Sequence, residues 1–453
     1  MKFKREHWSL YPLLFLFING MCLSRSRGNY RPVIIAVYCI AFYLFAFELF
    51  WPPVKVDVVK KTWLAQAVLV GFAIRLAVKP LIIYHYDNAP YHWVQALLWI
   101  ACAGTLLRFL IKSPRALVTG FWVAGLAFVT ARILTLGASP NPFIDVYVWI
   151  SQACRYFMDG KNPYVQNYVD IYLEAGGQSY YPPTFNYPPG LLFWCLPFEK
   201  LFHDIRGGYV MADVVTAICL YFGAKRLKSP RFFSETLALL WLAFPVGLFT
   251  LEQAWVDALL VMGTALMALA LLHGWWIAAG IAVGFTLGVK QYSLFVALFA
   301  VVWVWRSQSR KIFIRFFIAA VGTTSALYLP FLLAAPGPFY YSVVQSLLNQ
   351  PRRMDSFSLT ALLNNQFLLV VPNSLVTLIS GVGFLALFLP LILGKKVDAA
   401  DYGRRLVVLY GIVFLCGKQA FCNYYQFLAF LLLLHIGGSA TIERNRANRV
   451  YQS

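Results

Sequence analysis

Long apolar segments separated by short polar ones follow one another along almost the whole chain. A helix that crosses a membrane needs about 20 mostly apolar residues. Apolar runs of this kind occupy 9–23, 32–51, 64–84, 94–111, 116–136, 207–224, 233–250, 253–273, 276–305, 316–335, 361–371, 375–394 and two sections of 406–438. The run 276–305 is long enough for a hairpin, and 361–371 amounts to half a span. The pattern predicts an all-α polytopic membrane protein.

Composition agrees with this prediction. Hydrophobic residues make up 60% of the 453 residues, charged residues 12%, and the mean hydropathy is +0.66, values typical of polytopic membrane proteins. The apolar runs leave no room for a soluble domain of ordinary size. The first run follows a basic start, as a signal peptide does, but no small-residue cleavage site comes after it, so we expect it to be retained.

The net charge of +20 reflects membrane topology, and we expect no nucleic-acid partner. Lys and Arg gather in short clusters between apolar runs: 112–115, 224–231, 306–315, 394–396, 402–405 and the tail 443–449. The positive-inside rule puts these clusters on the cytoplasmic side. The opposite side then receives 137–206, 251–257, 336–358 and 417–426. One basic stretch, "SRSRGNYR" (Ser24 to Arg31), falls on that outer side if the short first run spans; that run could instead be re-entrant or interfacial.

The outer segment 137–206 is too long for a simple connector, and long loops of this kind are often functional. After a Ser-Pro-Asn-Pro stop, Ile144 to Met158 has the period of an amphipathic helix that could lie on the membrane surface, with Tyr147, Ile150, Cys154 and Phe157 on one stripe. Asp145 falls in its first turn, where the helix dipole favours a carboxylate. A simple N-terminal acid beside an aromatic belt would also explain this pattern.

The rest of the segment favours a binding site. It contains "DGKNPY" and then "YYPPTFNYPPGLLFWCLPFEKLF", whose prolines fix the backbone before a short apolar helix. Aromatic rings with a few fixed polar groups suit a site for a sugar and a lipid. The eight cysteines show no metal-ligand spacing, and a disulfide between Cys154 and Cys195 is left open without being indicated.

These motifs resemble the GT-C superfamily of integral-membrane glycosyltransferases. The resemblance rests on an Asp just outside a span, "GKNPY", the "YPP" run with "GLLFWCLPFEKL", "GIAVGFTLGVKQYSLFV" and "NYYQFLAFLLLL", in that order between about Ala116 and His435. The chain is most similar to bacterial polyprenyl-phosphate-mannose-dependent α-mannosyltransferases. It differs in having about four apolar segments before the loop, and in reading "EQAWVD" where relatives often read Asn-Gly-Gln, so that only Gln253 matches there.

The resemblance implies a GT-C-like helical bundle with juxtamembrane helices in a large first extracytoplasmic loop. The chain would divide into additional helices (1–115), a catalytic module (116–438, with its loop at 137–206) and a cytoplasmic tail (439–453). It implies a multi-pass protein of the plasma membrane with its active site facing outward. A sugar, with mannose as the family's prior, would pass from a polyprenyl-phosphate donor to a lipid or glycan acceptor with inversion, and Asp145 would be the general base. No cofactor is required, and a divalent cation is left open without being indicated.

Cations on the outer side are candidates for the donor phosphate, because the positive-inside bias leaves that side poor in them. Lys290 lies near the midpoint of 276–305, where the family also has a lysine; snorkelling from a single span is the alternative. Arg352 and Arg353 suit bidentate phosphate contacts, but pairing with Asp355 or with headgroups explains them equally. Lys418 is a further candidate that a solvated loop also explains. Expected substrate-binding residues are Tyr147, Asn162, Tyr164, Tyr187, Gln253, Gln291 and Asn423.

Two other classes of function stay open. A lipid or glycolipid transporter or flippase is also polytopic and basic, and ionisable residues in apolar segments agree with it: Arg75, Lys79, Arg108, Arg132 and Asp213. The internal repeats common in transporters are not evident. A polymerase or ligase of lipid-linked glycans would also use outer loops, arginines and polyprenyl phosphates.

Overall fold

The structure, a computed structural model, describes residues 7–49, 55–177, 183–394 and 399–450. Lys395, Lys396 and the first residues of the proline-rich run, 179–182, lie outside the described residues. Nearly all of the described elements are helices, and two three-residue strands, β1 (His7–Ser9) and β2 (Lys55–Asp57), pair antiparallel. The first helices are α1 (Tyr11–Ser26), α2 (Pro32–Phe47), α3 (Val58–Val78), α4 (Ala89–Leu110) and α5 (Pro114–Ala138). The loop helices are α6 (Asp145–Met158), η1 (Pro163–Val165), α7 (Ile171–Glu174) and α8 (Pro189–Phe202).

The remaining elements complete the bundle. They are α9 (Arg206–Arg226), α10 (Arg231–Leu242), α11 (Gly247–Glu252), α12 (Asp257–His273), α13 (Trp276–Leu287), η2 (Gln291–Ser293), α14 (Leu294–Ser307), α15 (Arg310–Ala334), α16 (Pro336–Tyr340), η3 (Tyr341–Gln345), α17 (Ser346–Leu348), α18 (Leu359–Phe367), α19 (Asn373–Leu393), α20 (Ala399–Cys416) and α21 (Cys422–Val450).

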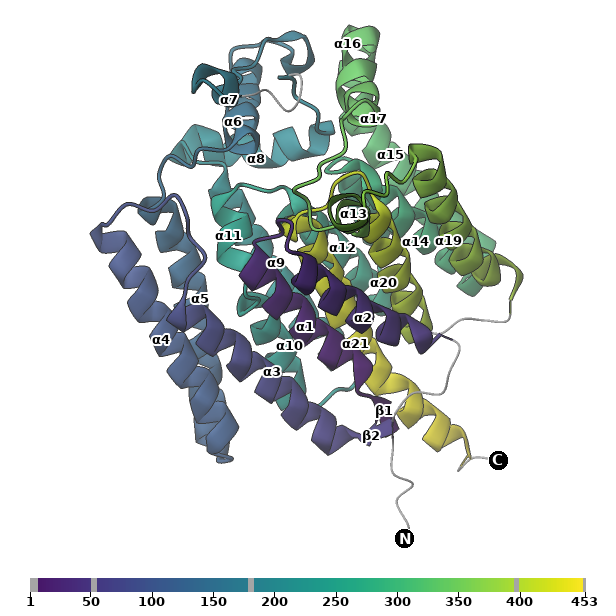
Figure 1. Cartoon of the computed structure of the whole chain (residues 1–453). Coiled ribbons are helices and arrows are strands. Elements are labelled where there is room, and N and C mark those ends of the chain that lie inside the picture. Colours follow the sequence, from purple (N-terminus) through teal and green to yellow (C-terminus); the bar gives the residue numbers. More distant parts are fainter. Residues whose placement is uncertain (1–6, 50–54, 178–182, 395–398, 451–453) are drawn as a thin grey trace.

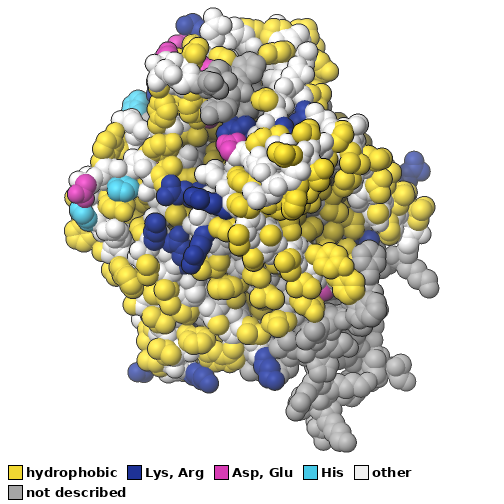
Figure 2. Space-filling model, in the orientation of Figure 1, with side chains coloured by type: hydrophobic (Ala, Val, Ile, Leu, Met, Phe, Trp, Pro, Cys, Tyr) yellow, Lys and Arg dark blue, Asp and Glu magenta, His cyan; other side chains and the backbone are white. Residues whose placement is uncertain are grey.

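Six of the predicted apolar runs form described helices that are long and apolar enough to cross a membrane. They cover Lys60–Val78, Ala89–Leu110, Pro114–Ala138, Arg206–Arg226, Arg310–Ala334 and Asn373–Leu393. Hydrophobic side chains cover much of the face seen in Figure 2. Exposed large hydrophobic residues include Ile133, Ile318 and Leu378. The prediction of an α-helical membrane protein is therefore confirmed.

Proline and glycine divide several of the predicted runs. The run 64–84 ends as a helix at Val78, just before Pro80, and 233–250 is divided into α10 and α11 on either side of Pro245. The run 276–305 is divided into α13 and α14, with Lys290 in extended backbone between them (φ −154°, ψ 139°). These breaks matter because non-helical backbone exposes polar groups, which must then find partners or line a cavity.

The segment 137–206 forms helices α6, α7 and α8, which lie together at one end of the molecule (Figure 1). Helix α6 has the predicted bounds to within one residue. Its stripe does not lie free on a membrane surface, however, because Ile150 and Cys154 are fully buried and α6 packs on α8. Arg155 joins the two helices through a 2.8 Å ion pair from its Nε to Glu199 Oε1.

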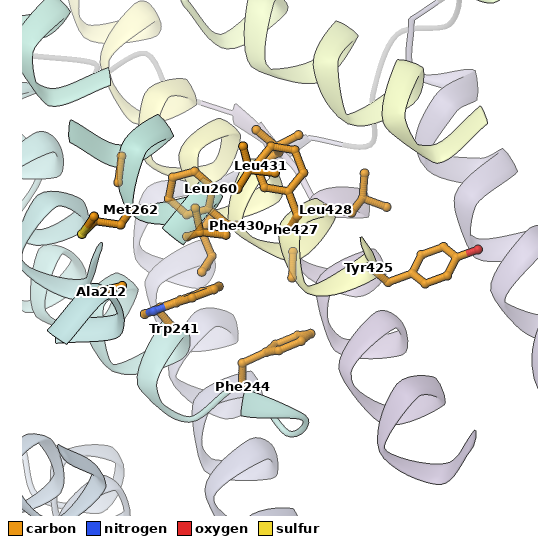
Figure 3. Close-up of a cluster of buried hydrophobic side chains, with 14 of the residues drawn as sticks. Ala212, Trp241, Phe244, Leu260, Met262, Tyr425, Phe427, Leu428, Phe430 and Leu431 are labelled. Carbon is orange, nitrogen blue, oxygen red and sulfur yellow. The ribbon is translucent and has the colours of Figure 1, made fainter. Parts of the chain in front are cut away.

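The core lies where α9, α10, α12 and α21 meet. Trp241, Leu260, Phe427 and Phe430 interdigitate there (Figure 3), and each is at most 1% exposed. Helices α4 and α5 pack more closely than large side chains allow: a Cβ on Gly104 would come within 2.9 Å of the Ala124 nitrogen. Small residues at such crossings let helix backbones approach each other inside a membrane.

Buried ion pairs join helices of the bundle. Arg108 Nη1 lies 2.8 Å from Glu235 Oε2, and Arg132 Nε lies 2.9 Å from Asp213 Oδ2. All four residues are at most 2% exposed. Each of these arginines thus has a carboxylate partner on a neighbouring helix, as ionisable groups in apolar surroundings require.

Candidate functional site

A cavity of about 580 Å³ opens among loops and the start of α6. Its walls come from segments far apart in the sequence: the turn after α1, the α3–α4 loop, α6, the proline-rich run, the breaks before α12 and α14, and the start of α21. Seven of the residues expected from the sequence line it or its floor: Asp145, Tyr187, Gln253, Lys290, Gln291, Arg353 and Asn423.

Asp145 is the carboxylate of this cavity. It is the first residue of α6 and is 7% exposed, and its Oδ1 accepts a hydrogen bond from the Val146 nitrogen at 2.8 Å. Burial raises the pKa of Asp145 above that of a free aspartate, and the Val146 hydrogen bond and the nearby Arg353 charge oppose this only in part. A carboxylate with a raised pKa is a better proton acceptor than an exposed one.

Lys290 lies in the wall, where it is part of a network around Asp257. Its Nζ donates to Asp257 Oδ2 at 2.8 Å, and Asn423 Nδ2 donates to the same oxygen at 2.6 Å. The Tyr292 hydroxyl donates to Asp257 Oδ1. The ammonium also lies over the rings of Tyr292 and Tyr424, 5.1 and 4.8 Å from their centroids. Asp257 uses one of the three N–H groups of Lys290, and the residue also lines the cavity.

Arg353 reaches the cavity from the loop after α17. Its Nη2 and Nε donate to the two oxygens of Asp355 at 2.6 and 2.8 Å, and its guanidinium lies over the Phe421 ring. The hydrogen bonds from Arg353 lower the pKa of Asp355. The alternative expected from the sequence, pairing with Asp355, is therefore present, although Arg353 still lines the cavity.

Arg27 is a lining cation that the sequence reasoning did not select. Arg27 and Gly28 both have left-handed backbone, with φ of 55° and 74°. A Cβ on Gly28 would overlap the backbone nitrogen of Cys422, so only glycine lets this turn lie against the start of α21. The turn thereby places Arg27 in the same wall as Asn423. Within the described parts of the chain, no ion pair involves Arg27, in contrast to Lys290 and Arg353.

The α3–α4 loop forms another wall, and Glu252 holds it. The two oxygens of Glu252, which is fully buried, accept hydrogen bonds from the backbone nitrogens of Ile83 and Tyr84 at 2.8 and 2.7 Å. Tyr84 consequently lines the cavity beside Asp145. Burial raises the pKa of Tyr84, and the charges of Glu252 and Asp145 raise it further.

Two amide oxygens in the wall have no partner among the described residues. Asn186 Oδ1 and Asn423 Oδ1 are buried and accept no hydrogen bond, although both residues line the cavity. Aromatic Tyr84, Trp149 and Tyr187 line the same space. These two oxygens are themselves closed off from the cavity space. Amide side chains beside aromatic rings nevertheless suit a ligand with hydroxyl groups and apolar C–H faces.

Five of the expected residues lie elsewhere. Tyr147 stacks on the guanidinium of Arg206, 5.1 Å from it. Asn162 caps η1 by accepting from the Tyr164 nitrogen, and Tyr164 is buried with its hydroxyl donating to the Tyr187 carbonyl. Arg352 donates to Asn373 Oδ1 at 2.8 Å, and Lys418 donates to the Leu348 carbonyl at 2.7 Å. Asn162 and Tyr164 therefore act on the shape of the loop, and none of the five lines the cavity.

The residues that sequence reasoning missed come mostly from the first quarter of the chain and from polar side chains of late loops. The charged and polar ones, with one tyrosine, are Arg27, Asn29, Tyr84, Asn186, Gln350 and Gln419, and the other aromatic ones include Trp149, Tyr172, Tyr292 and Tyr424. One signal for Arg27 was present in the sequence, because "SRSRGNYR" is a basic stretch that does not fit among the cytoplasmic clusters.

Among the described residues, no group of three His, Cys, Asp or Glu side chains could hold a metal ion. All eight cysteines are free, including Cys154 and Cys195. Comparison with protein-family models found no match to the chain, and comparison with curated proteins found none either.

Proposed function

We propose that the protein is an integral-membrane glycosyltransferase that moves a sugar, with mannose as the first candidate, from a polyprenyl-phosphate donor to a lipid or glycan acceptor. The observation that carries this proposal is the meeting, in one cavity of about 580 Å³, of a buried carboxylate, Asp145, with cations and amide side chains. A glycosyl transfer from a lipid phosphate needs all three: a base for the acceptor, cations for the leaving phosphate and acceptors for sugar hydroxyls.

Asp145 is the proposed general base. It takes the proton from an acceptor hydroxyl while that oxygen attacks the anomeric carbon, and the bond from that carbon to the phosphate oxygen breaks on the opposite face. Inversion of the anomeric centre follows. General-base assistance typically contributes about 10²- to 10⁴-fold to the rate. The raised pKa of Asp145 supports this role.

The leaving phosphate is assigned to Lys290, Arg353 and Arg27. Asp257 already neutralises Lys290, and Asp355 neutralises Arg353, so Arg27 would supply most of the net positive charge. Cations placed where negative charge develops stabilise the transition state by several kcal/mol. This is about the stabilisation that is lost when one hydrogen-bond donor to an oxyanion is removed. Sugar hydroxyls are assigned to Asn186 and Asn423, and the sugar ring to the aromatic wall.

The orientation that we propose puts the cavity on the extracytoplasmic side of the plasma membrane. Helices α4 and α5, α9 and α10, and α12 and α13 pack on each other in pairs joined by short turns. The basic clusters 112–115 and 224–231 belong to the first two of these turns, whereas the cavity is lined by loops at the other ends of the helices. Positive-inside bias supports the cytoplasmic placement of these turns.

The test uses the full-length protein, purified and reconstituted in nanodiscs, with radiolabelled polyprenyl-phosphate mannose and an extract of membrane lipids and glycans as acceptors. The expected result is a labelled glycosidic product that the Asp145→Asn variant forms about 100-fold more slowly, or slower still, while it binds the donor as before. Asp159→Asn is the matched control, because Asp159 ends the same helix but is exposed and lies outside the cavity.

Full turnover by Asp145→Asn would remove this carboxylate from the chemistry. Movement of the labelled lipid across the bilayer without a new glycosidic bond would favour a transporter or flippase. Growth of a lipid-linked glycan in steps of more than one sugar would favour a polymerase or ligase.

A further inference from the structure

A group of cations outside the cavity lies where α1 and α3 end. Arg25 and Lys79 are exposed, and Arg75 is half-buried; we call these three residues the basic patch. Arg75 is joined to α1 by two hydrogen bonds, from Nε to Ser24 Oγ at 3.1 Å and from Nη2 to the Ser24 carbonyl at 3.0 Å. Its Nη1 donates to the Lys79 carbonyl at 2.7 Å. Three backbone or hydroxyl contacts therefore hold this guanidinium in place.

Nothing acidic compensates the patch within the described residues. No ion pair there involves Arg25, Arg75 or Lys79, whereas buried Arg108 and Arg132 both have carboxylate partners. Arg75 contacts Ser24, the residue before Arg25, and the backbone of Lys79. Like charges on neighbouring residues repel one another, and the repulsion is weakly screened beside an apolar surface. Such an arrangement is favourable when an anion binds between the cations.

The basic patch also lies on the side of the molecule where few cations are expected. Helix α3 has Lys60 and Lys61 near its start, and Arg75 lies near its other end, just before Lys79. In α1, Arg25 lies two residues before Arg27, which lines the cavity. The patch thus belongs to the cavity side of the molecule, where positive-inside bias does not account for it. In Figure 2 a cluster of Lys and Arg side chains stands in the middle of the left part of this face, surrounded by hydrophobic side chains.

The surroundings point to a lipid as the source of the anion. Ile74 and Val78, on the same last turns of α3, are 42% and 65% exposed, and α3 is one of the six helices that can cross a membrane. A cation cluster at the end of such a helix, next to exposed apolar side chains, matches a phosphate headgroup above its acyl chains.

We propose that the basic patch binds the phosphate of an anionic glycerophospholipid, with Arg25, Arg75 and Lys79 as its ligands and the acyl chains along Ile74 and Val78. Arg75 offers its remaining N–H groups to phosphate oxygens in a fixed direction, and Arg25 and Lys79 close around them. The site is separate from the proposed catalytic groups and does not depend on glycosyl transfer, although it places a bilayer lipid at the edge of the cavity.

The test is position-resolved photolabelling of the full-length protein in phosphatidylcholine nanodiscs that contain a small fraction of a diazirine-bearing phosphatidylglycerol. Peptides covering 10–31 and 71–83 should be labelled, and unlabelled phosphatidylglycerol should compete. In the variant Arg25→Gln/Lys79→Gln this labelling should fall about tenfold or more, since each cation near a charged lipid surface contributes substantially to binding. Arg75 stays in place, and its bond to the Lys79 carbonyl is unaffected by the substitution.

Lys161→Gln is the matched control, because Lys161 is an exposed cation of the cavity-side loop outside the patch, and its labelling pattern should equal that of the wild type. Equal labelling by a diazirine-bearing phosphatidylcholine, or unchanged labelling in Arg25→Gln/Lys79→Gln, would overturn the proposal. Displacement by polyprenyl phosphate at equimolar amounts would assign the patch to the donor instead, and displacement by millimolar inorganic phosphate would make it a site for free anions. If the double variant does not fold, Arg25→Gln alone gives the same comparison.

Discussion

Lys290 donates a hydrogen bond from its Nζ to Asp257 Oδ2 at 2.8 Å, and this contact joins the break between α13 and α14 to the first residue of α12. Side chains of both residues are nearly buried, at 11% and 3% exposed. The same lysine compensates a buried carboxylate and lines the cavity, and in the proposed function it has a second role as a ligand of the donor phosphate. Any substitution of Lys290 alone mixes the two.

The first prediction separates these roles. Lys290→Met should destabilise the protein by about 3 kcal/mol, because it leaves the buried Asp257 charge without its cation. Adding Asp257→Asn should recover most of that loss, since the neutral amide can still bond Asn423 and Tyr292. Donor binding should stay weak in the double variant. The measurements are thermal unfolding and donor titration; recovery of donor binding together with stability would give Lys290 a structural role only.

The second prediction concerns pH. Because burial raises the pKa of Asp145, the base form appears only above a pH higher than the 3.8 of a free aspartate, and kcat/KM should rise with pH through that raised value. The rise should be absent from the residual activity of Asp145→Asn. A profile that keeps its acidic limb in Asp145→Asn would assign the limb to another group.

The raised pKa of Asp145 also determines how the stability of the folded protein depends on pH. The folded protein holds the Asp145 proton more tightly than the unfolded chain does, so this residue contributes most at acidic pH, and its contribution is lost as pH rises through the folded-state pKa. At pH 7 the buried negative charge of Asp145 lowers the free energy of unfolding, and Asp145→Asn removes that charge. We therefore expect the variant to unfold at an equal or higher temperature than the wild type at pH 7 while losing transfer. A lower melting temperature would show that the carboxylate is structurally required.

Local patterns and long-range contacts explain which parts of the fold and site were predictable. The bounds of α6 and the place of Asp145 follow from periodicity and a proline stop, and the break at Lys290 follows from the excessive length of its apolar run. Arg27 and Tyr84 could not be found this way, because they reach the cavity only through contacts of α1 with α21 and of Glu252 with the α3–α4 loop. A hydropathy profile contains no information about such long-range contacts.

Two loop residues show the opposite error, because the sequence predicted them in the site and the structure places them elsewhere. Asn162 and Tyr164 stand in a conspicuous "GKNPY" motif, yet their polar atoms are used within the loop itself, in a cap and a bond to the Tyr187 carbonyl. A motif identifies a segment that needs a particular shape, but the sequence does not say whether its side chains face a ligand or hold the backbone.

The third prediction concerns Arg27. If it supplies uncompensated charge to the donor phosphate, Arg27→Gln should raise the KM for the donor about tenfold, equivalent to about 1.4 kcal/mol, and should make binding less sensitive to salt. Arg31→Gln is the control, because Arg31 is exposed at the start of α2 and lies outside the cavity. The measurement is steady-state kinetics at two ionic strengths; equal KM values for the two variants would remove Arg27 from the phosphate site.

The fourth prediction concerns the ionisable residues inside the apolar helices. Arg132 and Asp213 pair with each other and do not line the cavity, so we expect a structural role. Arg132→Met should lower stability by about 3 kcal/mol, because the Asp213 charge then stays buried without a partner, whereas Arg132→Met/Asp213→Leu should be much closer to the wild type. Product formation per folded molecule should be unchanged in the double variant. A double variant that is fully stable but has lost lipid movement, measured in a flippase assay, would instead show that this pair carries a translocated substrate or proton.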